Sequence, residues 1–339
     1  MEFAKYFYKW YQLYRKEGLR KVTQNKYEDA YKKLANTKLG KTELKKVNRK
    51  IAQEYMDWYG STRRKATVYD HRAYLKACMS DAVADGDAKI NPFGRIQLHY
   101  VDQKFSTEKM LELRDQKKTL SFEEYKTFKN YLEFTIRKYL KEEPIRNWNL
   151  KVKNERKKNS VKQIHMMIIY VALKTGARFS EIVGLTWKDI SFNDQVIKIN
   201  KTWAYKYTNV TFEKTKNLGS IREIPVDQDF MDLMKLFKKW SWEHIETDEN
   251  TLFIETKVAM HDSTINKTLE VLLKECGIER LTLHKLRHTQ ASILLAEGID
   301  EHVVAKRLGH TDTTMIHRVY GHLVKEREDE DNERILKLL

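Results

Sequence analysis

Several residues in the last quarter of the chain have side chains suited to phosphate chemistry. His284 and Arg287 lie one helical turn apart, His310 follows a Leu-Gly pair, and Tyr320 comes ten residues later. An arginine presents a planar fork of donors to phosphate oxygens. A histidine can move a proton near neutral pH, and a tyrosine hydroxyl can be a covalent nucleophile when a base is at hand. The residue types therefore favour phosphate chemistry.

Helices are predicted to position these side chains. Apolar residues recur at helical spacing over 283–295, and Gly298 is placed to end this helix. His284 and Arg287 then share one face near a helix N-terminus, where the helix dipole favours an anion. A second helix is expected over 301–308, and Thr311 or Asp312 is expected to cap a third.

The segments HKLRH (284–288), RLGH (307–310) and VYGH (319–322) resemble motifs of the tyrosine recombinases, the phage-integrase type of site-specific DNA recombinase. They occur in that family's order and approximate spacing. A fourth segment, ARFSEI at 177–182, is similar to the family's first arginine motif. The resemblance covers nearly the whole chain and implies an integrase of a phage or of an integrative or conjugative mobile element.

The resemblance implies a catalytic role for each residue. Tyr320 would attack the DNA phosphate and become a 3′-phosphotyrosyl group. Arg178 and Arg287 would hold the two non-bridging oxygens, and His310 would donate a further hydrogen bond. His284 would accept the tyrosine proton. The chain would be an enzyme that cleaves and rejoins DNA strands by transesterification.

The family also places a lysine on a turn of a small sheet, where it protonates the leaving oxygen. Residues 213–225 resemble that turn, and the Lys-Thr pair assigns Lys214. The turn is longer than usual, which leaves Lys216 as an alternative. Glu181, in the first arginine motif, is expected to orient Arg178 or a neighbouring histidine.

No metal or other cofactor is expected. His284 and His288 are four residues apart, but no motif of the H-E-x-x-H kind accompanies them. Cys78 and Cys276 lie far apart in the chain and make neither a zinc site nor a disulfide framework. A covalent phosphotyrosyl link conserves the phosphodiester energy, so no nucleotide is needed.

The charge balance indicates a polyanionic partner. The 339 residues include 64 Lys and Arg against 48 Asp and Glu, a net charge of +16. Residues 1–104 hold 23 of these basic and 12 of these acidic residues, so most of the excess lies there. The sequence shows neither a run of about eighteen apolar residues nor a signal peptide. We therefore expect the protein in the bacterial cytoplasm, associated with the nucleoid.

The expected fold class is mainly α with a small antiparallel sheet (α+β). The chain is long enough for two domains with proper cores. The expected divisions are a helical core-type DNA-binding domain (1–95), a linker (96–118), a tyrosine-recombinase catalytic domain (119–322) and a C-terminal tail (323–339).

In the first domain, apolar stripes predict four helices, over 3–14, 27–34, 44–58 and 68–83. Thr23 is expected as an N-cap and residues 38–40 as a turn. The basic side chains on the other faces are candidates to follow a DNA backbone. They include Arg63, Arg64, Lys65 and Arg72.

In the second domain, Ser121 opens a capping box before a helix. A buried helix is expected over 161–173, ended by Gly176, with Ser180 as N-cap of the next helix. Period-two patterns predict strands at 195–200, 205–213 and 220–226, with a short strand at 252–254. Helices are expected at 227–244 and 263–276.

Each of three segments has two alternative interpretations. The basic stretch 137–158 either contacts DNA or is a solvated loop. The tail at 325–339 either packs on its own domain or docks on a neighbouring protomer. Residue 3 already lies in the first helix, so the protein either works without accessory arm sites or an arm-binding domain is missing from this sequence.

The resemblance also implies partners. These are double-stranded DNA attachment sites, a homodimer on each site, a homotetramer with a Holliday junction in the synaptic complex, and a directionality factor or host DNA-bending protein. A type IB topoisomerase uses a similar residue set, but the helical first domain and short length argue against it. A catalytically silent DNA-binding regulator would not explain all six catalytic residue types in order.

Overall fold

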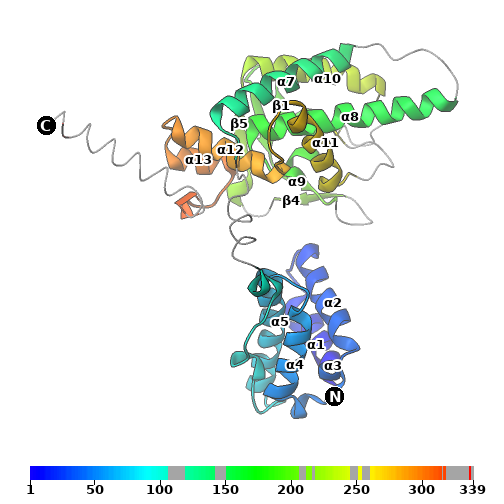
Figure 1. Cartoon of the computed structure of the whole chain (residues 1–339), viewed down its shortest axis with the longest axis vertical. Coiled ribbons are helices and arrows are strands. Elements are labelled where there is room, and N and C mark those ends of the chain that lie inside the picture. The colour runs from blue at the N-terminus through cyan, green and yellow to red at the C-terminus, as the bar shows by residue number, and fades with distance from the viewer. Residues whose placement is uncertain are drawn as a thin grey trace. The chain divides into compact units, whose positions relative to one another are not determined.

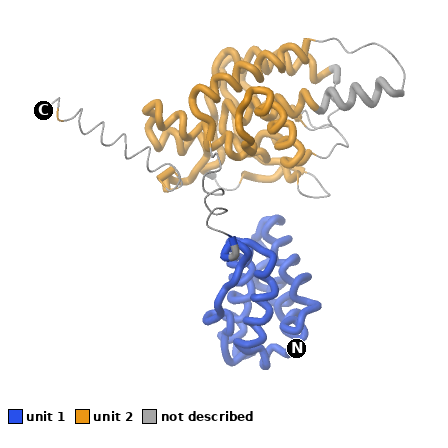
Figure 2. The backbone as a smooth tube through the Cα atoms, viewed as in Figure 1, with its two compact units in different colours: residues 1–116 blue, residues 117–339 orange. Residues whose placement is uncertain are grey.

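The computed structural model describes residues 1–105, 119–141, 150–205, 211–215, 218–244, 251–253, 260–314, 316–317 and 336. Within these ranges it describes the side chains of all residues except 104, 150–161, 218, 243 and 244. The chain divides into two compact units, Met1–Gln116 and Lys117–Leu339 (Figure 2). Each unit has its own hydrophobic core.

Unit 1 is helical throughout its described part (Figure 1). Its elements are α1 (Phe3–Trp10), which continues as a π-helical turn (Tyr11–Arg15), α2 (Lys21–Ala35), α3 (Lys38–Lys41), a 3-10 turn (Leu44–Lys46), α4 (Arg49–Gly60), α5 (Lys65–Ala84) and two further 3-10 turns (Pro92–Gly94 and Val101–Lys104). Aromatic side chains join these elements. Tyr27 of α2 stacks on Tyr11, with ring centroids 5.1 Å apart, and Phe7 lies 6.3 Å from Tyr27 on centroids. Burying an aromatic or aliphatic side chain of this size contributes about 1.5–3 kcal/mol to stability, so these packed aromatic side chains stabilise the helical bundle.

Three local expectations for unit 1 are wrong. The N-cap of α2 is Arg20, and Thr23 lies inside the helix. Residues 38–40 belong to the short helix α3, because the Thr37 side chain accepts a hydrogen bond from the Gly40 backbone N–H and caps it. The helix expected over 44–58 begins only at Arg49, where the Asn48 side chain caps α4, and residues 44–46 form a separate 3-10 turn.

Unit 2 combines helices with two small sheets (Figure 1). Its helices are α7 (Phe122–Lys141), α8 (Leu150–Thr175), α9 (Phe179–Val183), α10 (Gln228–His244), α11 (Asp262–Glu275), α12 (Leu283–Ala296) and α13 (Glu301–Leu308), with 3-10 turns at Trp187–Asp189 and Leu218–Ser220. Its strands are β1 (Ile190–Ser191), β2 (Val196–Ile199), β3 (Lys201–Trp203), β4 (Phe212–Lys214) and β5 (Arg222–Pro225). The predicted fold class, mainly α with a small antiparallel sheet, is confirmed.

The strands pair only in antiparallel fashion. The order of the three-stranded sheet is β1-β2-β5, and Ile197 at its centre pairs with Ile190 on one side and Ile224 on the other. All three isoleucines are buried, so one face of this sheet packs on the core. β3 and β4 form a separate hairpin in which Lys201 lies opposite Lys214.

The strand predictions are partly wrong. The strand expected over 205–213 starts only at Phe212, and residues 206–210 lie outside the described part of the chain. Residues 252–253 form no strand. The neighbouring Thr251 makes a single bridge to Thr186, and the Leu252 backbone N–H donates to the Leu185 carbonyl at 3.0 Å. The side chains of Leu252 and Phe253 are fully buried, so their apolar character reflects core packing instead of a strand ladder.

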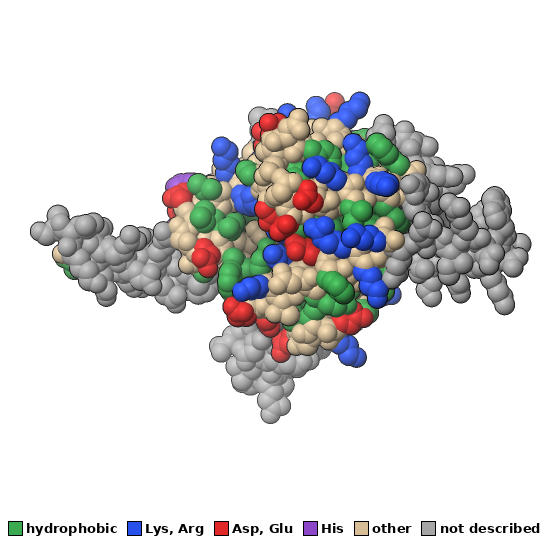
Figure 3. Space-filling view, turned by 90° about the horizontal axis from the view of Figure 1, so that it is seen from above, with side chains coloured by type: hydrophobic (Ala, Val, Ile, Leu, Met, Phe, Trp, Pro, Cys, Tyr) green, Lys and Arg blue, Asp and Glu red, His purple; other side chains and the backbone are tan. Residues whose placement is uncertain are grey.

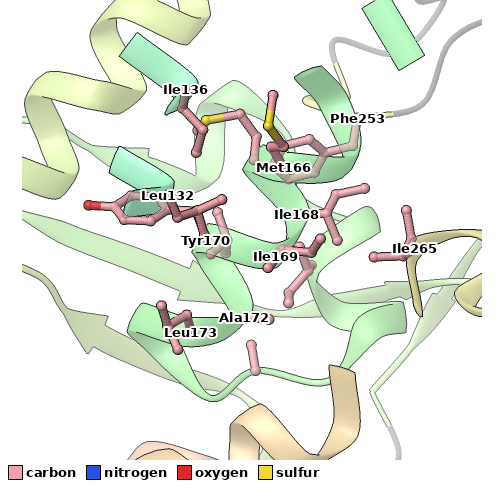
Figure 4. Packing of buried hydrophobic residues seen from close by; sticks show 14 of the residues in the cluster. Leu132, Ile136, Met166, Ile168, Ile169, Tyr170, Ala172, Leu173, Phe253 and Ile265 are labelled. Atoms are coloured by element: carbon pink, nitrogen blue, oxygen red, sulfur yellow. The ribbon is translucent and has the colours of Figure 1, made fainter. Parts of the chain in front are cut away.

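Helix α8 is the centre of unit 2. Its described apolar residues from Ile164 to Leu173 are buried on every side, because α7, α11 and α12 all pack against it. Figure 4 shows Ile168, Ile169 and Tyr170 of α8 pointing in different directions into the surrounding core. A helix that is apolar all round must be enclosed by other elements. This explains why the run at 161–173 has no single stripe.

The helix expected over 161–173 begins already at Leu150, so part of the basic stretch 137–158 is helical. Three other predicted helix ends are confirmed. Ser121 and Glu124 form the expected capping box, in which each side chain accepts a hydrogen bond from the other residue's backbone N–H, at 3.2 and 2.8 Å. Gly298 has a positive φ directly after α12. Asp312 caps the next helical turn by accepting from the Thr314 backbone N–H at 2.9 Å.

Candidate active site

Three side chains from α12 and α13 bind the free carbonyls at the end of α8. Gln290 Nε2 donates to the Leu173 carbonyl at 2.8 Å, Arg307 Nη2 to the Lys174 carbonyl at 3.0 Å, and Arg287 Nη1 to the Gly176 carbonyl at 2.8 Å. The last carbonyls of a helix lack partners within the helix and carry partial negative charge, which favours cationic donors. The chemistry-bearing helix α12 is therefore fixed to the central helix of the core.

Gly176 makes the turn that follows α8. Its φ is +65°, and a Cβ here would lie 2.6 Å from Leu308 Cδ2. Only glycine combines this backbone conformation with so close an approach of α13. The turn directs the chain toward Arg178, two residues later.

Arg178 is the N-cap residue of α9, which corrects the expectation that Ser180 would cap this helix. Glu181 supplies the capping carboxylate instead: Oε2 accepts from the Arg178 backbone N–H at 2.9 Å. Oε1 accepts from Arg178 Nη1 at 2.8 Å, and Arg178 Nη2 donates to the Gly309 carbonyl at 3.3 Å. Arg178 is thus held between its own helix and the turn before His310.

Arg222 also contacts Glu181, and sequence reasoning did not single it out. Its Nη2 donates to Glu181 Oε2 at 2.9 Å, and both side chains are 2% exposed. Burial alone would raise the pKa of the Glu181 carboxyl, but Arg222 and Arg178 together hold it below its usual range. One signal in the sequence could have revealed Arg222: it is an arginine on a predicted strand whose apolar residues are expected to face the core.

His284 and His288 lie on the first turns of α12, with ring centroids 5.1 Å apart in an edge-to-face arrangement. Partial burial lowers the pKa of His284, and the neighbouring Arg287 and Arg178 lower it further. The pKa of His288 falls to about 4 through burial, His284 and Arg287. Both rings are neutral at pH 7, and a neutral imidazole can accept a proton.

His310 follows a left-handed residue. Gly309 has φ +71° and ends α13, and the His310 backbone N–H returns to the Ala305 carbonyl at 3.0 Å. Burial lowers the pKa of His310 to about 4, with Arg287, Arg178 and Arg222 adding to the effect. Its Nδ1 is buried and has no hydrogen-bond partner within the described part of the chain.

The structure therefore brings Arg178, Arg287, His284 and His310 to one place. The two arginines lower the pKa of both histidines, which is the electrostatic signature of their proximity. Cations gathered around neutral imidazoles form a site for an anion, because an anion would relieve their mutual repulsion. We refer to these four residues as the cationic cluster.

Lys214 is exposed at the end of β4. The strand paired with it, β3, lies close to α9, because a Cβ at Gly184, directly after α9, would lie 3.0 Å from the backbone of Thr202 and Trp203. The opposite residue, Lys201, forms an ion pair with Asp189. Lys216 and Tyr320 lie outside the described residues.

The four basic residues expected to follow DNA differ in their surroundings. The Arg63 guanidinium lies 4.2 Å from the Tyr59 ring centroid and donates to the Tyr59 carbonyl at 3.0 Å. Arg72 Nε donates to the Phe93 carbonyl at 2.9 Å. Arg64, whose side chain is 68% exposed, lies 4.0 Å from Asp102, and Lys65 is exposed near the rings of two tyrosines.

Two other features are absent among the described residues, a metal-binding group and a membrane-spanning helix. No group of three or more His, Cys, Asp or Glu side chains there is placed to hold a metal ion. No helix in the same part of the chain has the length and apolar character needed to cross a bilayer. On the face in Figure 3, acidic and basic side chains lie interspersed with apolar ones, so this face does not carry a patch of one sign.

The fold and the cationic cluster together define a two-unit protein in which two arginines and two histidines meet at the junction of α8, α9, α12 and α13. Comparison with known proteins identifies the family. The phage integrase family matches residues 138–327, more than half of the chain, and the chain belongs to this family. The predicted resemblance to the tyrosine recombinases is confirmed.

Individual relatives agree with this assignment. The integrase of Staphylococcus phage L54a is 29% identical over 181 residues, which cover 50% of this chain and 51% of the relative. The ICEBs1 integrase of Bacillus subtilis is 30% identical over 185 residues, which cover 50% of this chain and 48% of the relative. The matched segment spans about half the length of these relatives.

Solved structures share the fold. The integrase of transposon Tn1549, in complex with a circular intermediate DNA, has a TM-score of 0.71 at 20% identity, with 99% of each chain covered. A lambda integrase dimer bound to a COC′ core site has a TM-score of 0.57 at 15% identity and covers 93% of this chain and 97% of that chain. At these identities the likeness establishes the architecture of both units.

Proposed function

We propose that this protein is a site-specific DNA recombinase that cuts and rejoins strands through a 3′-phosphotyrosyl intermediate. The observation that carries the proposal is the cationic cluster, in which two arginines converge with two neutral histidines. Family membership supports the same conclusion, and so do the related integrase structures, which are complexes with DNA.

In the proposed reaction, the Tyr320 oxygen attacks the DNA phosphorus while the bond to the 5′-oxygen breaks. Arg178 and Arg287 stabilise the charge on the two non-bridging oxygens, and His310 donates a further hydrogen bond. Lys214, or Lys216 on the same turn, protonates the departing 5′-oxygen. The 3′-phosphotyrosyl bond preserves the energy of the phosphodiester, so attack by a 5′-hydroxyl of another strand reverses the step and completes the exchange.

The electrostatics of the cluster suit His284 as the acceptor of the tyrosine proton. Arg287 and Arg178 lower its pKa in the free protein, which keeps the ring neutral and ready to accept a proton. A bound phosphate is anionic and offsets both arginines, so it raises the basicity of His284 only when DNA is in place. Base strength is thereby coupled to substrate binding.

The positive charge of residues 1–104 suits a DNA-binding role for unit 1. Of the linker expected over 96–118, residues 96–104 belong to unit 1, where Ile96 is buried in the core. We place the protein on paired attachment sites of a phage or integrative element, as a homodimer on each site and a homotetramer in the strand-exchange complex. A directionality factor or host DNA-bending protein would set the direction of exchange. The bacterial cytoplasm is the compartment in which these partners meet.

The proposal is tested with a nicked duplex of a candidate attachment site, which traps the covalent intermediate. The unsubstituted protein is expected to form an adduct that survives a denaturing gel, and Tyr320→Phe is expected to form none while binding the duplex equally well. Tyr205→Phe, which removes a hydroxyl from a half-buried tyrosine of the same unit, serves as the matched control and should retain the adduct. An adduct with Tyr320→Phe would overturn the assignment of the nucleophile. Tight binding without any adduct by the unsubstituted protein on its own element's site would favour a silent binding protein.

A further inference from the structure

Arg222 sits at the start of β5 with all three of its guanidinium nitrogens in hydrogen bonds. Nε donates to the Arg307 carbonyl at 2.6 Å, Nη1 to the Ser220 carbonyl at 2.9 Å, and Nη2 to Glu181 at 2.9 Å. Its side chain is 2% exposed. Burying a guanidinium is costly unless partners of good geometry surround it, and here they do.

Two of these partners belong to elements that carry the cationic cluster, and Ser220 lies in the 3-10 turn just before β5. Glu181 lies on α9 and binds Arg178, while the Arg307 carbonyl lies in the last turn of α13. Gly309 also lies close to the Arg222 guanidinium, because a Cβ at this position would be 2.7 Å from Arg222 Nη1. The Arg222 guanidinium therefore packs directly beneath the turn that presents His310.

We infer that Arg222 is a positioning residue for the cleavage reaction. Through Glu181 it holds Arg178, and by direct contact it holds the Gly309–His310 turn, so that the distance between Arg178 and this turn stays constant. The role in catalysis rests on the proposed function, whereas the positioning itself does not. Arg222 is buried behind Glu181 and acts through the residues it holds.

The arrangement requires an arginine. A planar fork can reach a carboxylate on one side and two carbonyls on the others at the same time, whereas a lysine ammonium is a single point of charge on a flexible stem. Glu181 in turn needs a cation on each side, because it is a buried carboxylate. Loss of Arg222 leaves Glu181 with Arg178 alone and removes the support below Gly309.

The test compares Arg222→Lys and Arg222→Met with the unsubstituted full-length protein on the nicked duplex. At saturating DNA, the rate of adduct formation is expected to fall by roughly 10–100-fold, in the range for misplaced catalytic groups. The Kd for the duplex is expected to stay within about threefold, because Arg222 is covered by protein. The lysine variant should recover little of the rate.

Lys174→Met is the matched control. Lys174 is also a buried cation, with a side chain 9% exposed, and it forms an ion pair with Asp227. It does not contact Glu181 within the described structure. This variant is expected to lose thermal stability as the Arg222 variants do, but to keep its adduct rate within about threefold below the unfolding transition.

Two readouts separate positioning from general damage. In a double-mutant cycle, Arg222→Met is expected to lower the rate less in a Glu181→Gln background than in the unsubstituted protein, because part of its effect passes through that carboxylate. Hydrogen exchange of peptides covering residues 305–314 needs no cleavage. It should be faster in Arg222→Met and unchanged in Lys174→Met, so it tests positioning even if the proposed reaction fails. Unchanged exchange, or fully additive rate losses in the cycle, would overturn the inference.

Discussion

His71 in unit 1 and His310 in unit 2 both have a pKa far below that of free histidine, yet their surroundings differ. Burial lowers the pKa of His71 to about 3, with smaller effects of Lys33 and Arg63. Its Nε2 lies 2.7 Å from the Tyr55 hydroxyl, and its ring stacks on Tyr59 with centroids 3.9 Å apart. His310 reaches about 4 through burial and three arginines, and its buried Nδ1 has no partner in the described part of the chain.

The comparison separates a histidine whose hydrogen bonding is satisfied inside the protein from one that the proposed reaction would use. A ring whose polar atom is satisfied and whose faces are stacked needs nothing from outside the protein. A buried ring with an unsatisfied nitrogen among several arginines is suited to an anionic ligand from outside the protein. A lowered pKa and nearby cations are common to both, whereas the hydrogen bonds of the ring nitrogens distinguish them.

The largest expected effect comes from removing a cation of the cluster. Arg287→Ala is expected to slow adduct formation by about 10²–10³-fold, the range for losing one group that stabilises transition-state charge. Rapid-quench kinetics on the nicked duplex measure it. Arg280→Ala is the control, because that side chain is 70% exposed in an ion pair with Glu270. A rate loss shared by both variants would contradict a specific role of Arg287.

The two histidines should respond in opposite ways. His310→Ala is expected to lower the adduct rate by roughly 10²-fold, with a change in the free energy of unfolding below about 1 kcal/mol, because its Nδ1 makes no bond that folding depends on. His71→Leu should leave the rate per folded molecule unchanged and destabilise unit 1 by about 1–3 kcal/mol, since it leaves the buried Tyr55 hydroxyl without its partner. Comparable rate losses in both variants would remove the distinction.

The pH dependence of stability sharpens the same contrast. Between about pH 6.5 and pH 3 the unfolded chain protonates residue 71 while the folded chain does not, so His71 makes stability fall as the pH falls. His71→Leu should therefore flatten the decline of stability below pH 6.5 in chemical denaturation followed by tryptophan fluorescence. An unchanged slope would show that His71 titrates normally in the folded protein.

Two glycines with the same backbone conformation provide a smaller contrast. Gly277 has φ +69° with nothing within 4 Å of its Cβ position, whereas Gly309 has φ +71° with Arg222 Nη1 at 2.7 Å. Gly277→Ala should cost about 1–2 kcal/mol of stability, the cost of a left-handed alanine, and leave the chemistry intact. Gly309→Ala should add to this a loss of roughly tenfold in adduct rate, because Arg222 must move. Equal behaviour of the two variants in calorimetry and cleavage would contradict the packing argument.

Much of the fold could be read from the sequence because local signals determine it. Glycine and capping residues placed α12, α13 and the start of α7 correctly, since their energetics involve only neighbouring residues. The errors arose where two local signals competed. Ser180 is a good N-cap by type, but Arg178 occupies that position because Glu181 reaches back to its backbone N–H.

The sequence was less informative about long-range partners. Arg222 contacts Glu181, 41 residues earlier, and the Arg307 carbonyl, 85 residues later, and nothing in its neighbourhood indicates either. Strand boundaries around Lys214 were also misplaced, because pairing with β3 and the approach of α9 decide them. Residue types alone indicated the chemistry of the candidate site. The residues that hold its side chains in place, such as Arg222, could be identified only from the tertiary structure.

The smallest expected effect concerns the four basic residues of unit 1, which also divide into packed and exposed. Arg64→Ala should weaken duplex binding about equally for all sequences and reduce the slope of log K against log salt by about 1, as for one lost phosphate contact. Arg72→Ala should leave that slope unchanged and lower stability instead, because its Nε supports the Phe93 carbonyl from inside the unit. Fluorescence anisotropy across a salt series separates the two. An equal change of slope for both variants would show that Arg72 gives up its hydrogen bond to the Phe93 carbonyl and contacts DNA. Packed and exposed arginines in this unit would then not be distinct classes.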